Sequence, residues 1–160
     1  MASEALSSKG IYTHDKIIPL KYMRVYVAGG WFSPEQETTL NELERLVDRW
    51  FKYSFKPRHD ANADSELTFK EIFDLDVEAL RCSDLVVAST VGKDMGTLWE
   101  CGYAAALGIP IIYFTPGIKT VNLMLAKSGS VVRDEGEFEL ALAKLGEDKG
   151  NYTFSEMELE

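Results

Sequence analysis

Leu85-Val86-Val87-Ala88-Ser89 is an uninterrupted, mainly apolar run of strand length. After a short polar loop, residues 96–107 form a small and apolar run that predicts a helix. Only one charged residue, Glu100, stands within that helix. A carboxylate there would lie near the carboxyl end of a buried strand, where open α/β sheets bind ligands. The sequence therefore marks Glu100 as a candidate nucleophile or acid–base group.

A local structural explanation of Glu100 is also open. Thr97-x-x-Glu100 matches a helix capping box, and a glutamate in a first turn is favoured by the helix dipole. The local sequence alone does not decide between a cap and a functional carboxylate.

Strands and helices alternate along the rest of the chain. We expect strands at 23–28, 51–56, 85–89, 109–114 and 131–132. We expect helices at 34–50, 68–80, 96–107, 122–127 and 135–145. Nearly all-apolar strands indicate a parallel sheet covered on both faces. The right-handed crossover rule then favours a single α/β domain with a doubly wound, flavodoxin-like or Rossmann-like sheet.

Two helix starts have strong local signals. Ser33, Pro34 and Gln36 form a capping box with proline in the first turn, and Thr68-x-x-Glu71 forms another box. We assign residues 22–147 to the domain, 1–21 to an N-terminal extension and 148–160 to an acidic tail.

Length, charge and cysteine use narrow the class of protein. A chain of 160 residues is most simply one domain. The formal charge of −9 argues against a nucleic-acid polymer as partner and disfavours anionic membranes. No apolar run reaches membrane-spanning length, and the N-terminus lacks the features of a secretory signal. Cys82 and Cys101 form no CxxC pair, so we expect reduced thiols and a cytoplasmic protein.

The loop after the first strand reads Ala28-Gly29-Gly30-Trp31-Phe32-Ser33. It is neither a dinucleotide fingerprint nor a Walker A loop, because the final glycine and the Gly-Lys-Ser/Thr are missing. Gly29 permits close approach of the backbone to a ligand or a tight turn. Trp31 and Phe32 offer faces on which a nucleobase could stack. Alternatively, these rings pack the following helix onto the sheet.

We expect three carboxylates to converge from two segments. Asp76 lies in the helix before the strand at 85–89, and Asp94 and Glu100 follow that strand. Each has an ordinary alternative, because Asp94 fits a turn and Asp76 fits a solvated helix face. Between Asp74 and Asp76, we expect Asp74 to be the solvated one.

Four blocks of the chain, taken together, resemble the nucleoside 2-deoxyribosyltransferase family. They are residues 25–32, 76–84, 94–104 and 121–124. The resemblance implies a catalytic group of Tyr26, Asp76 and the nucleophile Glu100. It also implies a substrate-binding group of Asp94, Asn122, Gly29, Trp31, Phe32 and Met124. Asn122 would reach into the site of a neighbouring subunit.

The function implied by this resemblance is transfer of 2-deoxyribose from a 2′-deoxynucleoside to a free nucleobase. The transfer would proceed through a deoxyribosyl-Glu100 intermediate with retention, and it would need no metal or cofactor. A homo-oligomer built on dimers, possibly a hexamer, would share its sites between subunits. The alternatives are an N-glycoside hydrolase of deoxynucleosides or their 5′-monophosphates, and a non-catalytic nucleoside sensor.

The chain departs from relatives of this family in two places. Some relatives contact the base through a glutamine after the second strand, and residues 57–62 contain none. Related nucleotide glycosidases have serine- and arginine-rich phosphate contacts near the first loop, which residues 29–32 lack. The first difference bears on base preference, and the second argues against a nucleotide 5′-phosphate.

Overall fold

The computed structural model describes residues 10–13, 16–62 and 66–160 of the chain. Its main sheet has five parallel strands in the order β4-β3-β5-β6-β8. These strands are β3 (Arg24–Ala28), β4 (Tyr53–Phe55), β5 (Leu85–Ser89), β6 (Ile111–Phe114) and β8 (Ser130–Val132). In chain order this is 2-1-3-4-5, the flavodoxin-like order. The α/β class and the parallel sheet predicted from the sequence are confirmed.

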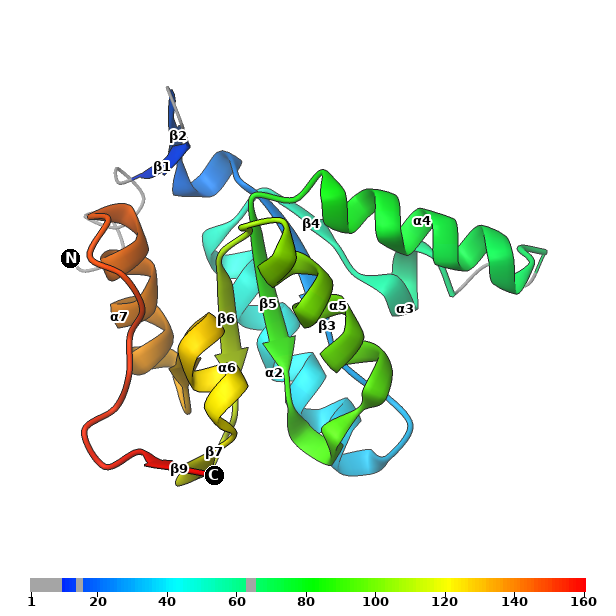
Figure 1. Ribbon diagram of the computed structural model, residues 1–160. Coiled ribbons are helices and arrows are strands. Elements are labelled where there is room, and N and C mark those ends of the chain that lie inside the picture. Colours follow the sequence, from blue (N-terminus) through cyan, green and yellow to red (C-terminus); the bar gives the residue numbers. More distant parts are fainter. Residues whose placement is uncertain (1–9, 14–15, 63–65) are drawn as a thin grey trace.

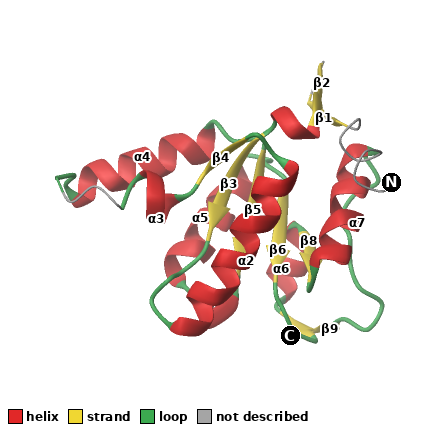
Figure 2. Cartoon of the chain, turned by 180° about the vertical axis from the view of Figure 1, so that it is seen from behind, coloured by secondary structure: helices red, strands yellow, loops and turns green. Residues whose placement is uncertain are grey.

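Helices cover both faces of this sheet (Figures 1 and 2). They are α2 (Pro34–Trp50), α4 (Phe69–Arg81), α5 (Met95–Ala106), α6 (Leu123–Ser128) and α7 (Glu135–Gly146). α2 and α7 pack on one face, and α5, α6 and the end of α4 pack on the other. All five predicted helices are present, with bounds that shift by one or two residues.

β5 shows why the strands are apolar on both sides. Leu85 and Val87 belong to the core under α2 and α7, whereas Val86 and Ala88 belong to the core under α5. All four side chains are completely buried. Successive side chains of a strand point to opposite faces, so a sheet covered on both faces buries every position. β5 is consequently a rigid base for the loop and helix that follow it.

The predicted box at Thr68 is confirmed, and so is Ser33 as the N-cap of α2, but Gln36 does not close a box at α2, because its Oε1 accepts from the Phe32 amide instead. Ser33 Oγ accepts a hydrogen bond from the Gln36 amide at 3.2 Å, at the start of α2. In the α4 box, Glu71 Oε2 accepts from the Thr68 amide at 2.7 Å, while Thr68 Oγ1 accepts from the Glu71 amide at 3.2 Å. These reciprocal bonds satisfy backbone donors that would otherwise have no partner.

The predicted capping box of Thr97 and Glu100 is wrong. α5 begins at Met95, and its N-cap is Asp94, whose Oδ2 accepts from the Thr97 amide at 2.9 Å. Thr97 Oγ1 donates to the same oxygen at 2.8 Å. Aspartate is among the best N-cap residues, so the helix starts earlier than the Thr-x-x-Glu pattern suggests. Glu100 therefore lies in the second turn, where its carboxylate is not needed as a cap.

Several shorter elements were not predicted. They are the antiparallel hairpin of β1 (Gly10–Thr13) and β2 (Lys16–Pro19), the 3-10 turns η1 (Leu20–Tyr22) and η2 (Val91–Lys93), α3 (Pro57–Asp60), and the parallel pair of β7 (Thr120–Val121) and β9 (Glu158–Leu159). Leu20 and Phe154 are buried, so segments at both ends of the chain pack onto the domain. Residues 1–9, part of the expected extension, lie outside the described residues.

α4 projects beyond the edge of the sheet (Figure 1). Only Leu80, near its end, is buried among its residues, while Phe69 and Phe73 are 92% and 50% exposed. Exposed aromatic rings on a helix otherwise held at one end indicate a surface for another molecule. In the described part of the chain, no helix is long and apolar enough to cross a membrane.

Candidate active site

The centre of the candidate site is a short hydrogen bond between β3 and α5. Tyr26, completely buried on β3, donates its hydroxyl hydrogen to Glu100 Oε1 at an Oη–Oε1 distance of 2.6 Å. The two residues are 74 positions apart in the chain. They meet because β3 pairs with β5, and α5 follows β5 and packs over both strands. A hydroxyl bonded to a carboxylate at this distance is a strong, charge-assisted contact.

The surroundings of Glu100 change its acidity. Burial raises its pKa, the hydrogen bond from Tyr26 lowers it, and the charges of Asp76 and Asp94 raise it further, to about 7. Burial also raises the pKa of Tyr26 well above its ordinary value, so its hydroxyl stays protonated as a donor. Glu100 is therefore a poorly solvated carboxylate that changes charge near neutral pH, as expected of a functional group.

Asp76 of α4 lies close enough for its charge to act on Glu100. Burial raises the pKa of Asp76 to about 6. Its Oδ1 atom is buried and has no hydrogen-bond partner among the described residues. Buried polar atoms are rarely left unsatisfied, so this oxygen is suited to a group that a ligand supplies. Asp74 is exposed and pairs with Lys70, which agrees with its predicted solvation.

Asp94 has a structural role as the N-cap of α5. That role uses Oδ2, and the carboxylate is close enough to raise the pKa of Glu100. Asp94 is thus a helix cap rather than the turn residue of the ordinary alternative. Its role in binding substrate stays a prediction, in which Oδ1 would be the contacting atom.

The loop after β3 combines packing with an exposed aromatic ring. A Cβ atom on Gly29 would lie 2.7 Å from Leu40 Cδ1, so this glycine lets α2 pack tightly against the sheet. Trp31 packs against the core on the α2 side, as the packing alternative predicts. Its ring stacks on that of Phe32 with centroids 5.1 Å apart, and Phe32 is 74% exposed. Phe32 is therefore the ring of this pair that is free to contact a ligand.

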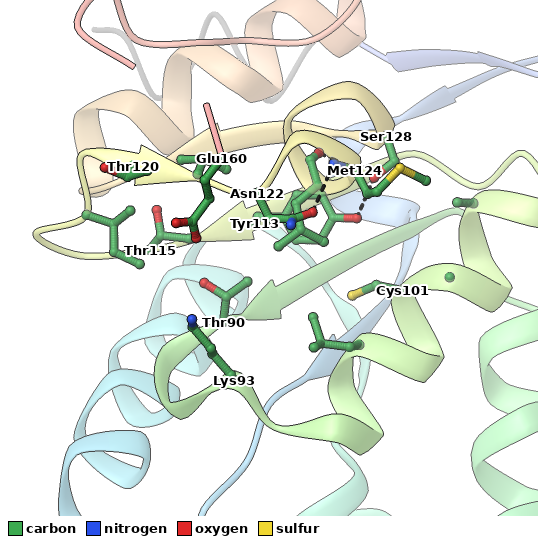
Figure 3. Close-up of a pocket in the computed structure, with 16 residues that line it drawn as sticks. Thr90, Lys93, Cys101, Tyr113, Thr115, Thr120, Asn122, Met124, Ser128 and Glu160 are labelled. Atoms are coloured by element: carbon green, nitrogen blue, oxygen red, sulfur yellow. Dashed lines mark hydrogen bonds between the residues drawn. The ribbon is translucent and has the colours of Figure 1, made fainter. Parts of the chain in front are cut away.

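A separate cavity of about 550 Å³ lies between α5 and the segment from β7 to α6 (Figure 3). Cys101 and Gly102 line it from α5, and Asn122 and Met124 line it from the opposite side. Its lining contains neither Glu100 nor Tyr26. Asn122 and Met124 therefore face this cavity, which does not contain the Glu100 carboxylate that they are expected to assist.

Asn122 also has a local structural role. Its Oδ1 accepts a hydrogen bond from the Met124 amide at 2.9 Å and caps α6. Met124 is 73% exposed. The Nδ2 donor of Asn122 has no partner in the part of the chain that the structure describes, so a substrate hydroxyl could still bond to it.

Several aromatic residues near the carboxylates were missed by the sequence analysis. Phe55, the last residue of β4, stacks on the Tyr26 ring with centroids 5.6 Å apart. Across α4 and α5, the Trp99 ring lies 5.7 Å from Phe73 and 5.3 Å from Tyr103. An aromatic residue at the carboxyl end of a predicted strand was the signal for Phe55. No group of metal-ligating side chains is present among the described residues.

Comparisons with known proteins agree with this geometry. Residues 25–139 match the model of the nucleoside 2-deoxyribosyltransferase family. The solved structure of the 2-deoxyribosyltransferase from Bacillus psychrosaccharolyticus is similar, with a TM-score of 0.69 and 25% identity, covering 82% of this chain and 99% of that one. A CMP N-glycosidase from Clostridium botulinum shares the fold, with a TM-score of 0.51 and 19% identity, over 75% of this chain and 98% of that one. No curated protein sequence matches.

The family match covers most of the chain and includes Tyr26, Asp76, Asp94, Glu100 and Asn122. The chain belongs to the nucleoside 2-deoxyribosyltransferase family. Membership rests on the family match, and the N-glycosidase, at 19% identity, adds only the shared fold.

The raised pKa of Glu100 predicts that this residue destabilises the folded protein at neutral pH. A carboxyl group whose folded pKa is raised from 4.5 to about 7 binds more protons folded than unfolded between those values. The penalty is absent below pH 4.5 and complete above pH 7. We expect Glu100→Gln to raise the free energy of unfolding at pH 8 by on the order of 1–3 kcal/mol, and by less at pH 5.

Denaturant unfolding at both pH values measures this difference. Glu71→Gln is the matched control, because hydrogen bonds from Thr68 lower the pKa of Glu71. Glu71 is thus ionised in both states over this range, and its substitution should have the same effect at pH 5 and pH 8. An effect of Glu100→Gln that is equally independent of pH would contradict the raised pKa.

Proposed function

We propose that this protein transfers 2-deoxyribose between nucleobases, with Glu100 as the nucleophile. The observation that carries the proposal is the half-buried Glu100 carboxylate, held by Tyr26 at 2.6 Å with a pKa of about 7. A glycosyl transition state resembles an oxocarbenium ion, and a carboxylate beneath C1′ stabilises that positive charge before bonding to it. Family membership and the similarity to a 2-deoxyribosyltransferase support the same chemistry.

The first half-reaction forms the covalent intermediate. One oxygen of ionised Glu100 bonds to C1′ as the glycosidic C1′–N bond breaks, and the electron pair of that bond leaves with the base. The departing base takes a proton from Asp76, whose raised pKa of about 6 keeps part of it protonated near neutral pH. Tyr26 keeps its hydrogen bond to the other carboxylate oxygen and orients the attack.

The second half-reaction reverses these steps with another base. A free nucleobase gives up a proton to Asp76, and its nitrogen attacks C1′ from the face that the first base left. The C1′–O bond to Glu100 breaks, and the carboxylate is regenerated. Two inversions give net retention. Phe32 and the unpaired Oδ1 of Asp76 are the groups that we assign to the base.

A hydrolase that discharges the same intermediate to water is the nearest rival. Incubation of the protein with thymidine, with and without free adenine, separates the two activities by chromatography of the products. We expect deoxyadenosine and thymine when adenine is present. Thymine alone would indicate a hydrolase, and no change with a panel of deoxynucleosides would leave the non-catalytic sensor.

Glu100→Ala and Glu100→Gln should abolish transfer in a protein that remains folded. The reason is that the proposed mechanism forms the bond to C1′ through the Glu100 carboxylate. Product formation and circular dichroism should be measured together, with Glu71→Gln as a control in an exposed glutamate of α4. Activity within a few fold of the unsubstituted protein in folded Glu100→Ala would remove the nucleophile assignment.

Asp76→Asn should slow the reaction most when the leaving base is poor. Protonation of the base is needed for natural nucleosides and much less for substrates with an activated leaving group. We expect a loss in kcat/KM of about 10²–10⁴-fold for thymidine and a far smaller loss for the activated substrate. Asp74→Asn, exposed on the same helix, is the matched control. Equal slowing of both substrates would assign Asp76 to positioning instead.

We also propose that the active unit is an oligomer in which Asn122 completes a neighbouring site. Two observations support it. Asn122 and Met124 line a cavity that excludes the Glu100 of their own chain. In addition, the exposed rings of Phe73 and Trp99 form a surface beside the carboxylates that suits a second copy.

Mixing two inactive variants tests this arrangement. Glu100→Ala and Asn122→Ala proteins are combined under conditions that allow subunits to exchange. Mixed oligomers would contain some sites with an intact Glu100 from one chain and an intact Asn122 from the other, so activity should partly return. Activity that stays absent after demonstrated exchange, or a fully active monomer in sedimentation, would refute the shared site.

A further inference from the structure

Gln36 is a buried amide that connects two loops at the ligand-binding edge of the sheet. Its side chain is in α2, and the residue is only 7% exposed. Oε1 accepts a hydrogen bond from the Phe32 amide at 3.0 Å, and Nε2 donates to the Val91 carbonyl at 3.3 Å. One side chain thereby joins the loop after β3 to the turn η2 after β5.

Both loops approach this amide closely, each through a glycine. A Cβ atom on Gly30 would lie 2.8 Å from Gln36 Nε2, and one on Gly92 would lie 2.5 Å from it. Gly92 also has a φ of +76°, which disfavours other residues. The Gln36 amide is therefore packed tightly between the two loops, and it is also hydrogen-bonded to both of them.

The two loops carry different parts of the candidate site. The loop after β3 presents the Trp31–Phe32 ring pair. The turn η2 leads through Asp94 into α5, which carries Glu100. A movement of one loop against the other would change the distance between the exposed ring and the nucleophile. Displacements of about 1 Å in such sites can cost about a hundredfold in rate.

We propose that Gln36 is a positioning residue that sets the start of α5, and with it Glu100, against the Phe32 loop. This proposal rests on the proposed function of Glu100 as nucleophile. Gln36 itself touches neither Glu100 nor any reacting atom; it acts through Val91 on one side and Phe32 on the other. The competing explanation is that Gln36 only completes the cap and packing of α2.

Two substitutions of Gln36 distinguish its contacts, because one removes a single hydrogen bond and the other removes both. Gln36→Glu has the same shape and keeps the acceptor for the Phe32 amide, but its ionised form cannot donate to the Val91 carbonyl. Gln36→Met fills a similar volume and loses both hydrogen bonds. The control is Ser33→Ala, which removes the N-cap bond from the Gln36 backbone amide but leaves both side-chain hydrogen bonds of Gln36 in place.

Kinetics with thymidine and adenine should distinguish the contact of Gln36 with Val91 from its contact with Phe32. At pH 8 we expect Gln36→Glu to lower kcat about tenfold or more with little change in KM, because only the contact to η2 is lost. Gln36→Met should lower kcat and also raise KM, because the Phe32 loop is released as well. Ser33→Ala should keep kcat and KM within about twofold of the unsubstituted protein, once kcat is expressed per folded molecule. Values for Gln36→Met within twofold of the unsubstituted protein would overturn the proposal.

The pH dependence of Gln36→Glu supplies a readout that a packing role would not produce. A protonated glutamic acid donates through its O–H and can restore the bond to the Val91 carbonyl. Burial raises the pKa of such a group, so restoration should begin above the usual range for glutamate. The activity of Gln36→Glu relative to the unsubstituted protein should rise as pH falls from 8 to 5.5. A relative activity that does not change with pH would count against a positioning role of the bond to Val91.

A measurement without substrate separates this proposal from the proposed function. Hydrogen exchange of the amides at 29–32 and 91–95 should be faster in Gln36→Met than in Ser33→Ala, whether or not either protein is active. If the unsubstituted protein turns over no deoxynucleoside, the proposed function fails while the exchange result still decides whether Gln36 couples the loops. Unchanged exchange at both segments would refute the coupling.

Discussion

The hydrogen bond from Tyr26 to Glu100 is the interaction on which the rest of the site depends. A charged carboxylate away from water is very unfavourable unless a donor satisfies it. In this chain the donor comes from β3 and the carboxylate from α5, so the bond requires β3 and β5 to be neighbours in the sheet. The flavodoxin-like strand order provides that adjacency, and Phe55 on β4 supports the other side of the tyrosine ring. Fold and site are thus linked through one contact.

Opposing effects on Glu100 leave its pKa near neutrality. Burial and the charges of Asp76 and Asp94 favour the protonated form, while Tyr26 favours the carboxylate. Without the hydrogen bond from the tyrosine, the pKa of Glu100 would be higher, which disfavours the ionised form that the proposed mechanism needs. Without the burial, the carboxylate would be well solvated and less reactive. In the proposed mechanism, such a site lowers stability in exchange for reactivity.

In the described structure, two faces of α5 border two different regions. The face that carries Glu100 meets Tyr26 on β3, whereas the face that carries Cys101 and Gly102 borders the cavity lined by Asn122. One chain therefore does not bring together all the residues that the family resemblance groups in a site. The shared site that we propose between two copies would resolve this separation and would give the exposed rings of α4 and α5 a partner.

The sequence by itself determined the order of the main strands and helices, the parallel sheet and the identity of the candidate nucleophile. Apolar strands and the caps at Ser33 and Thr68 act over a few residues, so local patterns report them. Only the tertiary structure decided that Asp94 caps α5, which leaves Glu100 free for Tyr26, and that Gln36 connects two loops. The cap was ambiguous because Asp94 and Thr97 are both good N-cap residues within one turn. The contact between Tyr26 and Glu100 spans 74 positions and depends on which strands are neighbours, which no local pattern contains.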